Sequence, residues 1–87
     1  MQIKLTSEAK EHLLYWRKTG NKAILTKIEK LTDAIAENPY TGLGKPEPLK
    51  HNLSGCWSRR INSEHRYLYE INNDILIILS LKGHYED

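Results

Sequence analysis

The run Ile75-Leu76-Ile77-Ile78-Leu79 is the longest uninterrupted apolar stretch in the chain. A run of this length, rich in branched side chains, predicts a strand in the middle of a sheet with both of its faces buried. The polar residues Asn72-Asn73-Asp74 come directly before it, and the aromatic and branched residues of 65–71 come before them. We therefore expect residues 65–79 to form a β-hairpin around a tight turn.

Two further strands are expected. Gln2–Leu5 alternates polar and apolar residues, which predicts a short strand. Trp57–Ile61 is interpreted as another strand, followed by a turn at Asn62-Ser63.

Two stretches near the N-terminus carry apolar residues at helical spacing. The members of the two stripes are Ala9, Leu13 and Trp16, then Ile24, Ile28, Leu31 and Ile35. Thr6 or Ser7 is expected to cap the first helix, and Asn21 the second. Gly20 is expected to end the first helix and Asn38-Pro39 the second. Because the connection at Gly20 is short, the two helices should form an antiparallel hairpin.

The order strand, two helices, three strands predicts an α+β fold, in which the helix hairpin packs on one face of an antiparallel sheet. A chain of 87 residues is expected to form one domain, residues 1–87. One helix hairpin covers only one face of a sheet. The other face is therefore expected to be concave, polar and basic.

Residues 39–48 hold all three prolines of the chain together with Gly42 and Gly44, which predicts a loop of restricted geometry. Glu47 lies between Pro46 and Pro48. A proline pushes the residue before it toward an extended backbone, so the Glu47 carboxylate should be held in a fixed direction.

Residues 45–66 concentrate positive charge, with five cationic and two acidic side chains and hence a local excess of +3, against +2 for the whole chain. The cations are Lys45, Lys50, Arg59, Arg60 and Arg66, and the acids are Glu47 and Glu64. Such a field suggests a phosphate-bearing partner. A solvated basic loop is the alternative.

Strand alternation divides these cations between two faces. It puts Arg59 and Arg60 on opposite faces and allows Arg66, in the next strand, to lie beside Arg60 on the polar face. Two neighbouring guanidiniums repel unless an anion such as a phosphate bridges them. Alternatively, one of them pairs with Glu64 or Glu70. The sequence leaves both possibilities open.

Several kinds of site find no support. The four histidines show no HxH or HExxH spacing, and a single cysteine, Cys56, excludes an internal disulfide and a CxxC zinc site. We expect a core thiol at Cys56 and neither a metal nor another cofactor. No apolar run reaches the length of a membrane span and the N-terminus lacks the long apolar region of a signal peptide, so a cytoplasmic location away from membranes is expected.

Metal-free acid–base cleavage of a phosphodiester remains. RNA can be cut in this way because its own 2′-hydroxyl is an internal nucleophile. The reaction needs a base for the 2′-proton, a cation for the phosphorane charge and an acid for the departing 5′-oxygen. Glu47, Arg66 and His84 are residues of these three types, although a lone histidine near a C-terminus is more often structural or merely exposed.

Several runs of residues carry a resemblance to a known family. They are Gly44–Gly55, Trp57–Ile61, Glu64-His65-Arg66 and His84-Tyr85. Together they closely resemble the YoeB (Txe) family of bacterial toxins, within the RelE-like superfamily. The resemblance covers almost the whole chain and implies a RelE-like, microbial-RNase-like α+β fold. The chain departs from the family at Cys56, where an aromatic residue is common, and in its tail Glu86-Asp87.

The resemblance implies an mRNA interferase, a ribosome-dependent endoribonuclease that cuts mRNA in the A site of the 70S ribosome and inhibits translation. It also implies a type II toxin–antitoxin system with a YefM-like antitoxin, and a homodimer. The family's general base matches Glu47, its transition-state arginine matches Arg66 and its general acid matches His84. Its phosphate- or substrate-binding positions match Lys50, Arg60 and Tyr85.

Two other functions stay open at this point. A non-catalytic ribosome- or RNA-binding module, or an antitoxin-bound co-repressor, would use the same basic face. A small helical-hairpin interaction protein would leave Glu47, Arg66 and His84 without a role.

Overall fold

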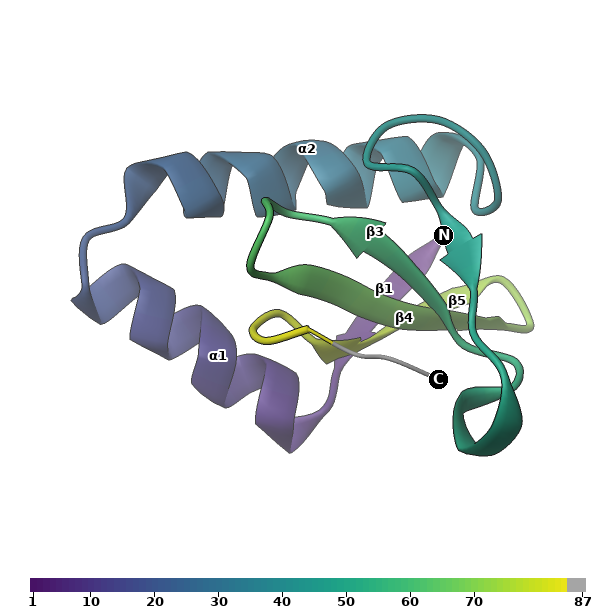
Figure 1. Cartoon of the computed structure of the whole chain (residues 1–87). Coiled ribbons are helices and arrows are strands. Elements are labelled where there is room, and N and C mark those ends of the chain that lie inside the picture. The colour runs from purple at the N-terminus through teal and green to yellow at the C-terminus, as the bar shows by residue number, and fades with distance from the viewer. Residues whose placement is uncertain (85–87) are drawn as a thin grey trace.

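The computed structural model describes residues 1–84 and has a mixed α+β architecture (Figure 1). Its elements in chain order are β1 (Gln2–Leu5), α1 (Ser7–Lys18), α2 (Lys22–Glu37), β2 (Glu47–Pro48), the 3-10 helix η1 (His51–Leu53), β3 (Trp57–Arg60), β4 (Arg66–Asn72) and β5 (Ile75–Ser80). The chain reverses direction between α1 and α2, so the predicted helix hairpin is confirmed (Figure 1). No helix within residues 1–84 combines the length and the apolar character that a bilayer crossing requires.

The five strands form one sheet in the order β1-β5-β4-β3-β2. Neighbouring strands from β2 to β5 are antiparallel, as expected, whereas β1 pairs with β5 in parallel. The parallel pair arises because the helix hairpin follows β1, so that β1 adds to the outer edge of β5 only after a long crossover. The predicted hairpin turn is also present, with Asn73 and Asp74 both at positive φ.

Strand β5 lies inside the sheet, between β1 and β4. Its residues alternate between buried (Leu76, Ile78, Ser80) and partly exposed (Ile75, Ile77, Leu79). The prediction of burial on both faces therefore holds fully for one face only, since the helices cover that face alone.

Local side-chain contacts explain where the helices begin and end. The Thr6 hydroxyl accepts a hydrogen bond from the Ala9 amide at 3.1 Å, and the Asn21 side chain accepts one from the Ile24 amide at 3.2 Å. Thr6, rather than Ser7, is thus the cap of α1. Gly20 adopts a φ of +68° just beyond α1, a conformation that glycine enters without steric cost.

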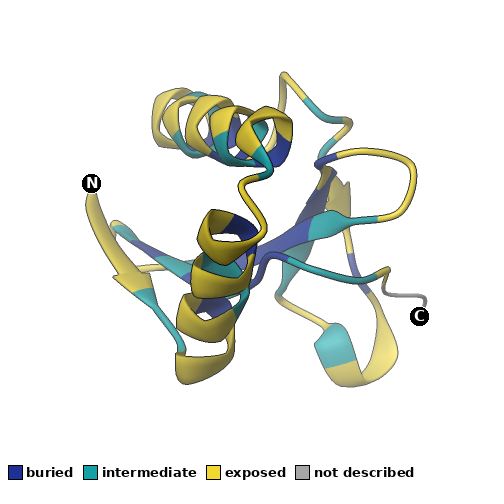
Figure 2. Ribbon diagram, turned by 90° about the vertical axis from the view of Figure 1, so that its left-hand side faces the viewer, coloured by how far each residue is buried: buried dark blue, intermediate teal, exposed yellow. Residues whose placement is uncertain are grey.

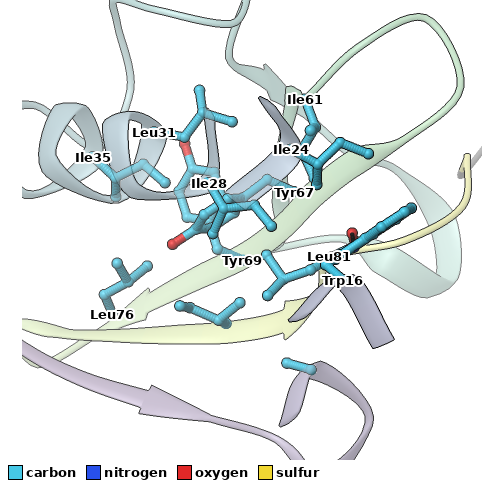
Figure 3. Close-up of a cluster of buried hydrophobic side chains, with 12 residues drawn as sticks. Trp16, Ile24, Ile28, Leu31, Ile35, Ile61, Tyr67, Tyr69, Leu76 and Leu81 are labelled. Atoms are coloured by element: carbon cyan, nitrogen blue, oxygen red, sulfur yellow. Dashed lines mark hydrogen bonds between the residues drawn. The ribbon is translucent and has the colours of Figure 1, made fainter. Parts of the chain in front are cut away.

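The core lies between the helices and one face of the sheet. All four residues of the predicted stripe on α2 are buried, as are Ala9 and Trp16 of α1. Figure 3 shows the α2 side chains directed toward Tyr67, Tyr69 and Leu76 of the sheet. In Figure 2 the buried residues of both helices face inward and the exposed ones outward. Each such aliphatic side chain stabilises the fold by about 2 kcal/mol on burial.

Candidate active site

The sheet has one face that the helices leave uncovered. Tyr67 and Tyr69 belong to the core cluster, and the Tyr67 hydroxyl is bonded to Thr32 of α2 at 2.8 Å, so these tyrosines mark the covered face. Side chains alternate along a strand, so Arg66 and Leu68 of β4 belong to the opposite, uncovered face.

Glu47 reaches this uncovered face from the edge of the sheet. In β2 it lies opposite Ser58 of β3, and Ser58 in turn lies opposite Leu68. Cross-strand partners point to the same side of a sheet, so the Glu47 side chain shares the face of Leu68. It is exposed, and its backbone is part of a strand. The predicted extended conformation of Glu47 is therefore confirmed.

Arg60 and Arg66 are direct cross-strand partners on the same face. Arg66 donates from Nη1 to the carbonyl oxygens of Asn62 at 2.8 Å and of His65 at 3.3 Å. Within residues 1–84 the structure records no ion pair between either arginine and Glu64 or Glu70. The predicted arginine pair is thus present, and the alternative in which a carboxylate neutralises it is not observed.

The residue before His84 is hydrogen-bonded to the main chain of Arg66. The Arg66 amide donates to the carbonyl oxygen of Gly83 at 2.8 Å, so the segment after β5 lies against the first residue of β4. The end of the described chain turns back beside the start of β4 in Figure 1. His84 follows Gly83 directly and is exposed.

Lys50 is an exposed residue on the connection from β2 to β3, where it precedes η1. Its neighbour Leu49 is buried, and the Leu49 amide donates to the carbonyl oxygen of Cys56, the residue before β3, at 2.9 Å. Tyr85 lies outside the described residues. The structure therefore brings Glu47, Arg60 and Arg66 onto one face, ties the chain next to His84 to Arg66, and places Lys50 three residues beyond Glu47.

Chemically, this arrangement offers a carboxylate and two guanidiniums on one surface of a sheet, and His84 follows the segment that is hydrogen-bonded to Arg66. A carboxylate and an imidazole can exchange protons with a bound molecule, and guanidiniums can bind an anion with two donors at once. Among residues 1–84 no group of three or more histidine, cysteine, aspartate or glutamate side chains is placed to hold a metal ion.

Counting Arg59 with the basic surface was wrong. Arg59 has no exposed surface, and it donates to the Tyr69 hydroxyl at 3.2 Å and to three main-chain carbonyls. The carbonyl acceptors are those of Asn38 at 2.6 Å, Thr41 at 3.0 Å and Leu43 at 3.0 Å. Alternation along the strand had already predicted that Arg59 and Arg60 lie on different faces of the sheet. The face that the helices cover has no solvent for a free charge. The surface of residues 45–66 thus keeps four cations against two acids.

Sequence reasoning did not find the role of Arg59, which holds the loop that leads to Glu47. Its acceptors span residues 38–43, and the Tyr69 hydroxyl donates to the Pro39 carbonyl at 2.6 Å in the same loop. An arginine on the predicted core face, next to a loop rich in proline and glycine, was the available signal.

Cys56 is partly buried, immediately before β3. Burial, and to a smaller extent the charge of Glu70, raises the pKa of its thiol above the ordinary value. A thiol that stays protonated is a poor nucleophile, which agrees with the interpretation of Cys56 as a core thiol and not a nucleophile.

Comparisons with known proteins agree on one family. Residues 5–85 match the model of the YoeB-like toxin of bacterial type II toxin–antitoxin systems. The chain is 50% identical over 86 residues to toxin YoeB of Synechocystis sp., covering 99% of each chain. It is 46% identical over 85 residues to toxin YoeB of Escherichia coli K12, covering 98% of this chain and 100% of the other.

Solved structures show the same likeness. The YoeB/ParE toxin of Agrobacterium tumefaciens superposes with a TM-score of 0.94 at 34% identity, over 98% of this chain and 100% of the other. Chains described as the YoeB–YefM complex and as the YoeB dimer of Staphylococcus aureus each superpose with a TM-score of 0.89, at 41% and 40% identity, over 98% of both chains. These likenesses confirm the RelE-like fold expected from the sequence.

Proposed function

The chain belongs to the family of YoeB-like toxins of bacterial type II toxin–antitoxin systems, and we propose that it is an mRNA interferase that cuts mRNA in the A site of the 70S ribosome and so inhibits translation. The observation that carries this proposal is the grouping of Glu47, Arg60 and Arg66 on the uncovered face, with the chain next to His84 bonded to Arg66.

In the proposed mechanism the RNA 2′-hydroxyl attacks the adjacent phosphorus, and the bond to the 5′-oxygen breaks. Glu47 takes the 2′-proton, and His84 gives a proton to the departing 5′-oxygen. Arg66, the first residue of β4, stabilises the extra negative charge of the phosphorane, and the hydrogen bond from its Nη1 to the Asn62 carbonyl helps to orient the guanidinium. No cofactor takes part.

Further residues are proposed to bind the substrate. Arg60 is paired across the strands with Arg66, which suits two successive phosphates or one bridging phosphate. Lys50 supplies a point charge from the neighbouring connection. Tyr85 is proposed from the family resemblance alone, since it lies outside the described residues.

The partners are proposed from the relatives. A YoeB–YefM complex and a YoeB dimer have been solved for the Staphylococcus aureus protein. We expect this chain likewise to bind a YefM-like antitoxin and to form a homodimer. We also propose that residues 1–87 act as one toxin domain in the cytoplasm.

The test is cleavage of a defined mRNA on programmed 70S ribosomes, read by primer extension. Glu47→Gln and His84→Gln should each slow cleavage by about 10²-fold or more, because each removes one proton-transfer group. Glu37→Gln, at the exposed end of α2, and His51→Gln, exposed in η1, are the matched controls and should cut at the rate of the unaltered protein.

Two results would count against the proposal. Equal rates for Glu47→Gln, His84→Gln and the controls would exclude the mechanism. A ribosome footprint without new RNA ends from the unaltered protein would instead favour the non-catalytic alternative, a ribosome- or RNA-binding module or an antitoxin-bound co-repressor.

A further inference from the structure

The three residues before His84 are held by side chains that are distant in the sequence. The Leu81 amide donates to Nδ1 of His12 on α1 at 3.1 Å, and the Leu81 carbonyl accepts from Nε1 of Trp16 at 2.9 Å. Two residues later, the Gly83 amide donates to Nδ1 of His65 at 2.9 Å. Two histidines, one in α1 and one directly before β4, thus accept main-chain hydrogen bonds from the same short segment.

These contacts define the chemical form of both rings. A main-chain amide can only donate, so Nδ1 of His12 and of His65 must each present a lone pair. Each ring is then neutral, with its proton on Nε2. A proton on Nδ1 would place two donors face to face and break the contact.

The contacts lie directly before His84 in the chain. His84 stands beyond the last strand, where a terminal segment is poorly ordered unless other parts of the fold hold it. Leu81 is fully buried between these contacts, and the Arg66 amide donates to the Gly83 carbonyl at 2.8 Å. The carbonyl of Gly83 is therefore bonded to Arg66 and its amide to His65, and Gly83 directly precedes His84.

We propose that His12 and His65 are positioning residues for His84: their Nδ1 acceptors dock residues 81–83 and so set where the His84 imidazole stands. The inference rests on the proposed role of His84 as the general acid. Proton transfer to a departing oxygen requires close approach, and a misplacement of about 1 Å can cost about 10²-fold in rate.

His65 allows the hydrogen bond to be separated from ring packing. Its ring meets the Trp16 indole edge to face, with centroids 4.8 Å apart. His65→Phe keeps a ring against Trp16 and removes the acceptor. His65→Asn removes the ring but keeps an amide oxygen near the place of Nδ1. His12→Leu and His12→Asn make the same comparison at the Leu81 contact.

The first measurement is amide hydrogen exchange by NMR, which needs no substrate. His65→Phe should speed exchange at Gly83 and His12→Leu at Leu81, each by about 10-fold or more, while the amides of β4 keep their protection. The asparagine variants should restore most of the protection. Nitrogen chemical shifts of the rings should report Nε2–H for both histidines in the unaltered protein.

The second measurement is cleavage on programmed ribosomes under single-turnover conditions. His65→Phe should lower the maximal rate by about 10- to 100-fold, with half-saturation by ribosomes changed less than about 3-fold. His65→Asn should recover most of the rate, and His51→Asn, an exposed histidine in η1, should match the unaltered protein.

The possible results distinguish a failure of this inference from a failure of the proposed mRNA cleavage. Unchanged exchange at Gly83 in His65→Phe, or a proton on Nδ1 of either ring, would overturn the docking. Faster exchange with an undiminished cleavage rate would overturn the positioning role. Undiminished cleavage by His84→Gln would refute the proposed role of His84, and the absence of new RNA ends with the unaltered protein would refute the proposed function. In either case the exchange data would still decide whether the two histidines dock the segment.

Discussion

Replacing Arg59 with alanine should destabilise this protein far more than replacing its neighbour Arg60. Both residues are arginines of β3, and both substitutions remove one positive charge. Arg60 is exposed, whereas Arg59 is fully buried and makes four hydrogen bonds from its guanidinium group. The pair therefore separates the effect of burial and hydrogen bonding from the effect of charge.

The size of the loss follows from those four hydrogen bonds. A hydrogen bond to a charged group contributes about 1.5–3 kcal/mol when it is buried. The three carbonyl acceptors belong to exposed residues that water can reach after the substitution, so we use about 1 kcal/mol per bond, the value for an ordinary intramolecular hydrogen bond. We expect a loss of about 4 kcal/mol, a large part of the roughly 4–13 kcal/mol that an 87-residue domain has in total. Arg60→Ala should cost no more than about 0.5 kcal/mol.

The assay is urea unfolding followed by tryptophan fluorescence, since Trp16 is buried and Trp57 lies two residues before Arg59. With an m-value of about 1–2 kcal/mol per molar, Arg59→Ala should lower the midpoint by about 2 M or more. Arg59→Lys, which keeps the charge but not the planar set of donors, should fall between the two alanine variants. Equal midpoints for Arg59→Ala and Arg60→Ala would refute the view that Arg59 stabilises the loop before Glu47.

Three further outcomes are expected. A Cβ added at Gly44 would lie 2.7 Å from a side-chain atom of α2, whereas one added at Gly55, which also has a positive φ, would meet open space. Gly44→Ala should therefore lower the free energy of unfolding by about 1–3 kcal/mol more than Gly55→Ala, and equal urea midpoints would contradict the clash. Burial raises the pKa of Tyr67 and Tyr69, so ionisation favours the unfolded chain. Stability should be constant below about pH 10 and fall above it, and an unchanged urea midpoint between about pH 9 and 11 would contradict this. Burial also raises the pKa of the Cys56 thiol, so iodoacetamide should alkylate the folded protein more slowly than the urea-unfolded chain near pH 8, and equal rates would argue against it.

Much of the local structure could be predicted because it depends on residues only a few positions apart. The caps at Thr6 and Asn21 each bind an amide three residues ahead, and the stripe on α2 repeats within single helical turns. The same is true of the alternation that put Arg60 and Arg66 on one face. The chemical types of the residues, and then the family resemblance, pointed to Glu47, Arg66 and His84, whose roles stay proposals.

Contacts between distant parts of the chain could not be predicted in this way. Neither the parallel pairing of β1 with β5 nor the register that sets Glu47 opposite Ser58 is visible in composition or periodicity. Arg59, as a charged residue, would ordinarily be expected in solvent. Its burial is favourable only because the folded loop presents three carbonyl oxygens to it.

The sequence by itself therefore determined the helices, the hairpin and the division of side chains between two faces, since short-range geometry dictates them. The tertiary structure alone decided which hydrogen-bond donors and acceptors meet when they are far apart in the sequence. His12 and His65 showed no recognisable spacing in the sequence, yet they bind amides 69 and 18 residues away, next to His84. Hydrogen bonds are directional and short, so only the folded arrangement of α1, β4 and the segment after β5 specifies them.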